Sequence, residues 1–491
     1  MILQFIKILI NSQSKEMKKI LIICTVLTVL FTACKEDNGN SVPQSKSPLI
    51  TQISPTVGLE NSILTIKGKR FSPAPAENIV KFSGVRGEVL TASDTLLTVL
   101  VPAGGSTGVL TITVKNSTAN GPAFTYGMPS ADVDENGNEI EYTYLTSTYA
   151  GANVAGNVLG TLAEARFMLP NGVSFDPTTG DLIVADRTAQ AIKRISKAGI
   201  VTKIAGTGTA GRVDGDISIA SFNNPYKTAV DKYGNIYVAD NGNHRIRKID
   251  LSTNTVSTIA GGAGAATSGY TDGIGANGLL NTPTGLAVDD DLNVYVADAA
   301  NHAVRKITPD GRVSTLAGNG IAGIADGIWP NVTVNRPTAV CMGKDGFLYS
   351  ADRYGQRIRK IDVRTGKTVT IAGSGGNAAG TGGHVDGEVL KARFNNIWGM
   401  DIDKDGTIYV SELEGTAGKS HTIRMIKNGQ VSTIGGPDAF DNNGYVNGLP
   451  GISRFYNPTD VAVDEEGNVF IADMNNYVIR KIVKIKKDTS N

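Results

Sequence analysis

The residues best spaced for metal chemistry lie in the segment DIDKDGTIYVSE. Asp401, Asp403, Asp405, Gly406 and Glu412 fill positions 1, 3, 5, 6 and 12 of a calcium-loop pattern, in which carboxylate oxygens would hold the ion. However, the stretch TIYVS that separates the acids has the composition of an extended strand, and a strand cannot curl round an ion. We therefore predict two strands joined by a hairpin here, and no metal site.

Imidazoles are the second possible source of metal ligands. The chain has only four, His244, His302, His384 and His421. The first two follow Asn in copies of a repeated motif, whereas His384 and His421 lie in loops with no tight ligand spacing. We expect no cofactor, and we interpret a lone loop histidine as a surface residue.

Six copies of one pattern follow residue 150. Each has short alternating strands, exemplified by TAVDKYGNIYVADNGNHRIRKID and VAVDEEGNVFIADMNNYVIRKIV, and a strand of the type VSTIAG ends most copies. Two positions recur in every copy. The first is an acid after the second strand, and the second is a base on the third strand, so we expect the two to pair. The acids are Asp186, Asp240, Asp298, Asp352, Glu412 and Asp473, and the bases are Lys193, Arg247, Arg305, Arg359, Arg424 and Arg480.

This pattern is typical of a β-propeller with four strands in each blade. It resembles NHL repeats, and Asn243-His244 and Asn301-His302 keep their namesake dipeptide. Some NHL-like propellers are zinc lyases with histidine ligands, so the resemblance also leaves a metal enzyme open. The sixth copy lacks its last strand, but YLTSTYAG (144–151) precedes the first copy and resembles that strand. We predict that it completes the last blade, because an open propeller would leave unpaired strand edges.

A separate domain precedes the propeller. Residues 48–127 hold short strands divided by turns, which indicates a small β-sandwich. The matching residues Ile53-Ser54-Pro55, Gly58, LTIKGKRF (64–71), VPAGG (101–105) and Phe124-Thr125-Tyr126 resemble an IPT/TIG domain, which has an immunoglobulin-like fold. The predicted class is therefore all-β: an Ig-like sandwich, a linker over 128–141 and a six-bladed propeller over 142–485. The sandwich is expected to be a spacer.

The first residues are interpreted as a targeting segment rather than as fold. We expect 1–33 to be a signal peptide whose true start is Met17, with a basic region and then an apolar stretch too short for a confident membrane span. LFTAC resembles a bacterial lipoprotein signal in which Cys34 becomes lipidated. Lys35-Glu36-Asp37 resembles the surface-export signal of Bacteroidetes lipoproteins, so 34–47 would be a tether. Cys341 would remain as a single buried thiol.

Propeller connectivity places the variable loops on one face, around the mouth of the central channel. The slot after the recurrent Pro begins the innermost strand there, and in the fifth blade Ile397 replaces that Pro. Two large aromatics among small polar residues could form a platform on which the apolar face of a sugar ring stacks. The residues in this slot are Asn171, Tyr226, Thr284, Thr338, Trp398 and Thr459.

Further candidates come from the loops expected on the same face. They are Tyr270, Trp329, Tyr354, Tyr445, and the insertion LEGTAGKSH with Lys419 and His421. This insertion lies in the blade that also carries Trp398. The alternative for Trp398 is that it packs between blades as core.

The balanced charge, +1 overall, gives no support to a nucleic-acid partner. Lipid anchor, Ig-like spacer and distal binding domain together resemble surface glycan-binding proteins of Bacteroidetes polysaccharide-utilisation systems. The resemblance implies an outer-membrane location, a glycan ligand, and as partners a transporter and its lipoprotein lid. Two alternatives stay open: a lyase or hydrolase acting at the channel mouth, and a protein–protein scaffold.

Overall fold

The structure is a computed structural model that describes residues 47–54, 56–58, 63–102, 104–126, 141–262, 264, 267–376, 382–413, 421–437 and 443–487. The predicted signal, Cys34, nearly all of the tether and all but the last residue of the linker lie outside these residues. No helix in the described part of the chain is long and apolar enough to cross a membrane.

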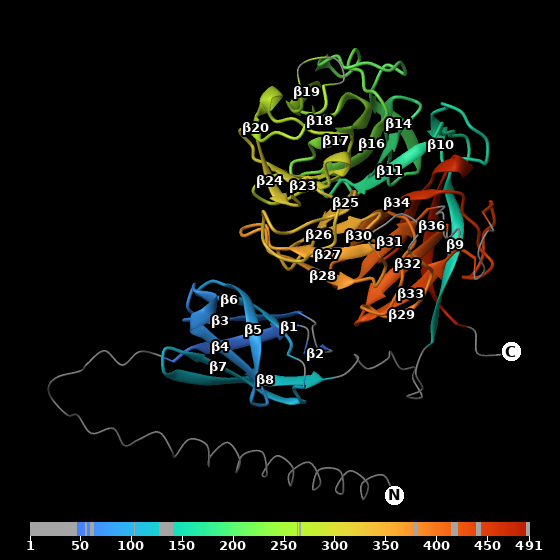
Figure 1. The fold of residues 1–491 in the computed structure, drawn as a ribbon. Helices are drawn as coiled ribbons and strands as arrows, with labels where there is room; N and C mark the ends of the chain where they lie inside the picture. The colour runs from blue at the N-terminus through green and yellow to red at the C-terminus, as the bar shows by residue number, and fades with distance from the viewer. Residues whose placement is uncertain are drawn as a thin grey trace, which may run out of the picture. The chain divides into compact units, whose positions relative to one another are not determined.

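Residues 49–126 form the predicted sandwich. Its strand order is β1-β3-β6-β5-β4-β7-β8-β2 (Figure 1). Alternating apolar residues fill its core, among them Leu64, Val80 and Leu110. The strands are β1 (Leu49–Ser54), β2 (Val57–Gly58), β3 (Ile63–Lys69), β4 (Asn78–Phe82), β5 (Val85–Ala92), β6 (Leu96–Leu100), β7 (Gly108–Val114) and β8 (Ser117–Tyr126), with a 3-10 turn η1 (Pro75–Glu77).

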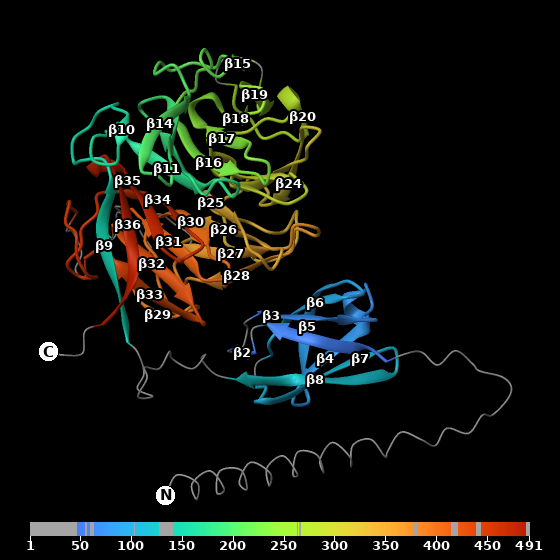
Figure 2. The ribbon, with the colours of Figure 1, turned by 180° about the vertical axis from the view of Figure 1, so that it is seen from behind.

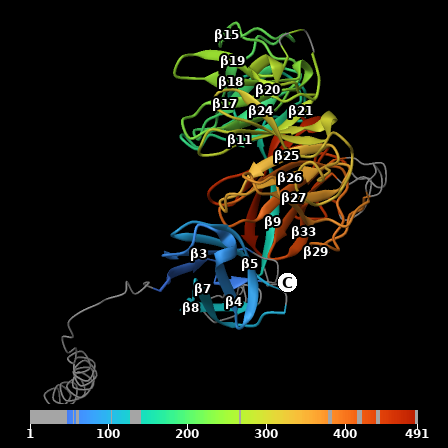
Figure 3. The ribbon, with the colours of Figure 1, turned by 60° about the vertical axis from the view of Figure 1, so that its left-hand side comes forward.

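The six predicted blades follow one another around the propeller in the order of the colours (Figure 3). Blade one is β10 (Gly160–Thr161), β11 (Pro170–Phe175), β12 (Leu182–Asp186), β13 (Ala191–Ile195) and β14 (Ile200–Ala205). Blade two is β15 (Gly215–Asp216), β16 (Pro225–Val230), β17 (Ile236–Asp240), β18 (Arg245–Asp250) and β19 (Thr255–Ala260). Blade three is β20 (Gly273–Ile274), β21 (Pro283–Val288), β22 (Val294–Asp298), β23 (Ala303–Ile307) and β24 (Arg312–Ala317).

Blade four is β25 (Pro337–Met342), β26 (Leu348–Asp352), β27 (Arg357–Ile361) and β28 (Thr368–Ala372). Blade five is β29 (Gly387–Glu388), β30 (Ile397–Ile402), β31 (Ile408–Glu412), β32 (Thr422–Lys427) and β33 (Gln430–Gly435). Blade six is β34 (Pro458–Val463), β35 (Val469–Asp473), β36 (Val478–Lys486) and β9 (Tyr142–Ala150). Short 3-10 turns η2 (Asn241–Asn243), η3 (Gly275–Asn277), η4 (Ala299–Asn301) and η5 (Met474–Asn476) lie between strands.

The closing strand is confirmed. β9 pairs with β36 in antiparallel register, with Thr148 opposite Arg480, and the two strands lie side by side from both directions (Figure 1 and Figure 2). The first strand of each blade contacts that of the next, and β34 contacts β11, so the inner strands form a closed ring. Blades two and five, three steps apart, therefore face each other across the channel.

One feature of the blades differs from the prediction of four strands. Blades one, two, three and five have a two-residue fifth strand outside the fourth. Three of these strands begin with a glycine at positive φ, namely Gly160 at 133°, Gly215 at 120° and Gly387 at 122°. Non-glycine residues rarely adopt this conformation, which explains the glycine at this turn.

Candidate functional site

The recurrent acids and bases form strand-to-strand pairs within each blade, as predicted. The bonds measure 2.8 Å for Lys193–Asp186, 2.9 Å for Arg247–Asp240 and 3.0 Å for Arg359–Asp352, and these side chains are fully buried. The acid also fixes the segment that enters the first strand, since Asp240 accepts the backbone N–H of Asn223. A buried pair so well hydrogen-bonded specifies blade geometry rather than chemistry.

A second acceptor for the buried arginines was not predicted from the sequence. Arg305 also bonds Asp272 at 2.7 Å, and Arg359 bonds Asp326 at 2.8 Å; both acids are about half exposed. Blade one has Leu159 in place of this acid and Lys193 in place of the arginine. The missed signal is the pair Asp-Gly, which marks the turn before the fifth strand.

The structure corrects the placement of His421. Its side chain is fully buried, and its Nδ1 accepts the backbone N–H of Asn457 at 3.1 Å. In the same way, the Nδ1 atoms of His244 and His302 accept the backbone N–H groups of Thr282 and Arg336, which lie at the start of the following blade. His421 is thus the fifth blade's copy of the repeat histidine and fastens neighbouring blades. The inserted loop before it, including Lys419, lies outside the described residues.

The calcium-like segment folds as the predicted hairpin. Asp403 Oδ1 accepts the backbone N–H groups of Asp405 and Thr407, which shapes the turn, while Glu412 bonds Arg424. His384 contacts the Thr433 hydroxyl at 3.0 Å. Within the described ranges, no three His, Cys, Asp or Glu side chains are placed to share a metal ion.

Four of the six slot residues face the protein interior. The Thr338 hydroxyl donates to the carbonyl of Ile397, the first residue of the next blade's inner strand. The hydroxyls of Thr284 and Thr459 lie within hydrogen-bond distance of a carbonyl in their own blade and of the corresponding first residue of the next blade, Pro337 or Pro170. All three threonines are buried. They join blades, so we leave them out of the binding surface proposed below.

Asn171 is the fourth buried slot residue. Its amide lies 3.4 Å from the Met474 sulfur, and its Oδ1 has no partner. Because its exposed surface is negligible, Asn171 also stays outside the proposed surface.

Tyr226 and Trp398 come together, although they are far apart in sequence and on opposite blades. Both are partly buried. Their ring centroids are 6.2 Å apart with an angle of 56° between the planes. Lys227 links the same two blades, because its ammonium donates to the Trp398 carbonyl at 2.7 Å. The same ammonium pairs with Asp460 of blade six at 2.9 Å.

Trp398 is therefore neither an ordinary core residue nor an isolated surface ring. Its indole Nε1 is shielded from solvent and has no hydrogen-bond partner among the residues that the structure describes. A buried N–H without an acceptor costs free energy, and an acceptor supplied by a bound molecule would remove that cost.

Arginines flank both rings. The Arg353 guanidinium lies 4.3 Å from the Trp398 centroid and 5.0 Å from that of Tyr354. Arg187 lies 4.9 Å from the Tyr226 centroid, and Arg336 lies 5.6 Å from that of Tyr354. We call the six residues Arg187, Tyr226, Arg336, Arg353, Tyr354 and Trp398 the arginine–aromatic cluster.

The sequence had predicted the three aromatic members of this cluster but not its arginines. Arg187 and Arg353 follow the recurrent acid directly, a position held by Asn241, Ala299, Leu413 and Met474 in the other blades. Departure from the repeat, the criterion that selected Trp398, would have selected these arginines as well.

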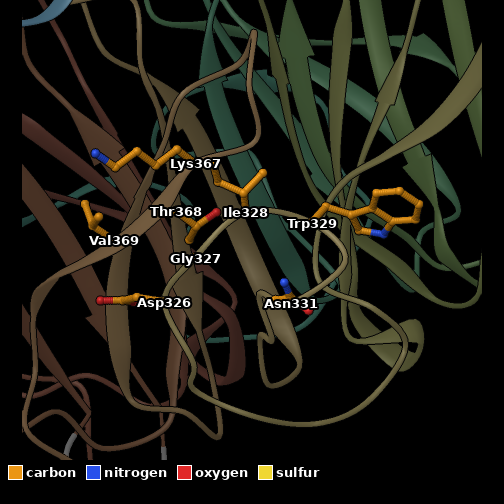
Figure 4. A pocket seen from close by; sticks show the side chains of 8 residues that line it. All are labelled: Asp326, Gly327, Ile328, Trp329, Asn331, Lys367, Thr368 and Val369. Atoms are coloured by element: carbon orange, nitrogen blue, oxygen red, sulfur yellow. The ribbon is translucent and has the colours of Figure 1, made fainter.

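The other aromatic candidates lie elsewhere. Tyr270 packs 5.0 Å from the buried Arg305, and Tyr445 packs 5.2 Å from Arg480, so both support the blade pairs. Trp329 is 52% exposed and lines a groove of about 610 Å³ along the outer strand of blade four. Its indole points away from Lys367 there (Figure 4). No cluster residue lines this groove.

The two parts of the chain match two known domain families. Residues 48–126 match the IPT/TIG domain, and residues 211–417 match the Teneurin NHL domain. The chain is an IPT/TIG domain followed by a six-bladed NHL propeller.

Curated relatives share only part of this chain. Protein SUPPRESSOR OF QUENCHING 1 of Arabidopsis thaliana is 28% identical over 333 residues, 65% of this chain and 31% of that protein. NHL repeat-containing protein 2 of Bos taurus is 25% identical over 349 residues, 65% of this chain and 47% of that protein. The chain therefore spans less than half of the length of each of these relatives.

Solved structures share the fold over nearly the whole chain. Proteins described as auxiliary nutrient binding proteins from Bacteroides thetaiotaomicron and Bacteroides ovatus both align with a TM-score of 0.52 at 16% identity. They cover 90% of this chain and 98% and 99% of their own. At this identity the likeness shows the fold alone.

Proposed function

We propose that this NHL propeller is a non-catalytic binding domain that captures a glycan on the face carrying the arginine–aromatic cluster. The observation that carries the proposal is the meeting of Tyr226 and Trp398 across the channel, with an unpartnered indole N–H. A sugar ring offers an apolar face to such rings and hydroxyl acceptors to the indole. The nutrient-binding description of the two Bacteroides proteins supports this class of function.

The proposal includes a location and partners. Cys34 within LFTAC would carry the lipid, and the IPT/TIG domain would be a spacer between the outer membrane and the propeller at the cell surface. An outer-membrane transporter with its lipoprotein partner would receive the glycan. Support for these points comes from the sequence motifs and from the description of the Bacteroides proteins.

The chain's two tryptophans provide a matched test. Trp329 lies in the outer groove, so Trp329→Phe leaves Trp398 as the single indole reporter. In a glycan-array screen followed by titration, we expect the fluorescence of Trp398 to shift with a ligand. We expect Trp398→Ala to lower affinity at least tenfold and Trp329→Ala to leave it unchanged.

Three results would contradict the proposal. They are unchanged binding by folded Trp398→Ala and Tyr226→Ala variants, equal loss in Trp329→Ala, and release of a cleaved product during incubation. The last would indicate the lyase or hydrolase alternative. Specific capture of a protein without any glycan response would instead favour the scaffold alternative.

A further inference from the structure

The charge of the arginine–aromatic cluster indicates which class of glycan it binds. This inference rests on the proposed glycan-binding function. Arg187, Arg336 and Arg353 form no ion pair with any carboxylate of the described residues. The arginines of the third strands are different, since Arg359 bonds two carboxylates. Arg336 and Arg353 both lie against the Tyr354 ring, so their two positive charges are close together.

The cluster arginines also differ from the third-strand arginines in their hydrogen bonds. In the described part of the protein, the side chains of Arg187 and Arg336 donate no hydrogen bond, and Arg353 donates one, from Nε to the Asn396 side chain. The Nε of Arg187 is also shielded from solvent without an acceptor. Guanidinium groups are strong donors with five N–H bonds, so nearly all of this capacity is unused.

Burial makes the unused capacity costly. Arg353 is partly buried, and loss of solvent lowers its pKa, with the neighbouring Arg336 acting in the same direction. The guanidinium still keeps its charge at physiological pH. A positive charge withdrawn from water without a counter-ion is unfavourable, and a bound anion would compensate it.

Geometry permits such an anion to bind beside a stacked sugar. An arginine whose face lies against an aromatic ring keeps its edge free for bidentate bonds to carboxylate or sulfate. The Arg353 guanidinium is near both Trp398 and Tyr354, and Arg187 is near Tyr226. A ring with one apolar face and one anionic substituent would therefore satisfy rings and guanidinium groups together.

We propose that the cluster selects an anionic saccharide, binding its carboxylate or sulfate through Arg353 and Arg187 while Tyr226 and Trp398 stack on the sugar. The shared chemistry is a planar or tetrahedral oxyanion on a sugar ring. Neutral sugars of the same backbone bind more weakly.

Matched pairs of saccharides test this selection on the whole chain. The carboxylate pair is oligogalacturonate and its methyl ester, and the sulfate pair is dextran sulfate and dextran. We expect at least one acidic member to bind about tenfold to a hundredfold more tightly than its uncharged partner, as charge-assisted bonds require. The pair that responds distinguishes the two anions.

Substitutions then test whether Arg353 and Arg187 cause the preference for the acidic saccharide. Arg353→Gln and Arg187→Gln should each abolish most of the preference for the acidic member, and Arg353→Lys should restore only part of it, because lysine lacks the planar fork. Arg364→Gln is the control, since Arg364 is 57% exposed in the hairpin before β28 and should not alter the preference. Thermal unfolding of each variant confirms that it is folded.

The outcomes separate the two proposals. Equal binding of both members of each pair, or a preference retained in both glutamine variants, overturns the anionic selection and leaves glycan binding intact. Absence of binding to every saccharide in the array, with no Trp398 fluorescence response in titrations with the four test saccharides, overturns both.

Discussion

Two sets of arginines in this propeller differ in their burial and in the acceptors around them. Those of the third strands, such as Arg359, are fully buried and surrounded by acceptors, with carboxylates of Asp352 and Asp326 on two sides. Those of the arginine–aromatic cluster are partly exposed; within the described structure Arg187 and Arg336 donate no side-chain hydrogen bond and Arg353 donates one. The comparison shows that the first set is committed to holding strands together, whereas the second has donors left for another molecule.

The largest effect is expected from breaking a strand-three pair. Arg359→Ala leaves the buried Asp352 carboxylate without its cation, so we expect a loss of about 3–5 kcal/mol in the free energy of unfolding. Denaturant titration followed by circular dichroism measures it. A loss below about 1 kcal/mol would contradict the structural role given to this pair.

A partly buried acid that forms no ion pair with any described residue offers the next test. Asp401 on β30 accepts backbone N–H groups of Ile402 and Val463, and burial raises its pKa to about 7. Because the folded pKa exceeds the unfolded value, its contribution to stability is present below about pH 4 and is lost as pH rises to about 7.

Comparison with the Asp401→Asn variant isolates the pH-dependent contribution of Asp401 to the free energy of unfolding. Unfolding titrations from pH 4 to 8 should show wild-type stability falling relative to the variant by up to about 4 kcal/mol, with a plateau above pH 7. A constant difference across this range would show that Asp401 is ionised throughout.

The outer acid of a strand-three arginine should matter less than the inner one. The Asp326 side chain is 46% exposed, so solvent screens its bond to Arg359. We expect Asp326→Ala to cost about 1 kcal/mol, measured in the same denaturant titration. A cost equal to that of Arg359→Ala would mean that the two acids share the charge equally.

The smallest effect on stability is expected at the mouth. Arg187→Ala removes a stacked side chain that donates no bond within the described structure, so unfolding should change by no more than about 0.5 kcal/mol. Glycan affinity, measured in parallel, should fall. A large loss of stability with unchanged affinity would reverse the comparison between the two arginine sets.

Repetition explains why the sequence predicted so much of the fold. The six blades, the closing strand β9 and the pairs such as Arg359–Asp352 all arise from neighbouring strands of a repeated unit, and each copy confirms the others. Only the short fifth strands were missed, since two residues are too few to show an alternating pattern. The Asp-Gly pairs that start three of them are visible in the sequence once their role is known.

The site depended on contacts that repetition does not encode. The sequence by itself determined that Tyr226 and Trp398 depart from their copies and that their slots begin inner strands. The predicted closed ring already sets blades two and five opposite each other, but only side-chain packing inside it decided that these two rings lie 6.2 Å apart. Tertiary packing also buried His421 and Thr338 between blades and left the guanidinium of Arg187 with no acceptor in the described part of the chain. The physical reason is that strand pairing is local in the chain, whereas burial and charge compensation depend on neighbours supplied by distant blades.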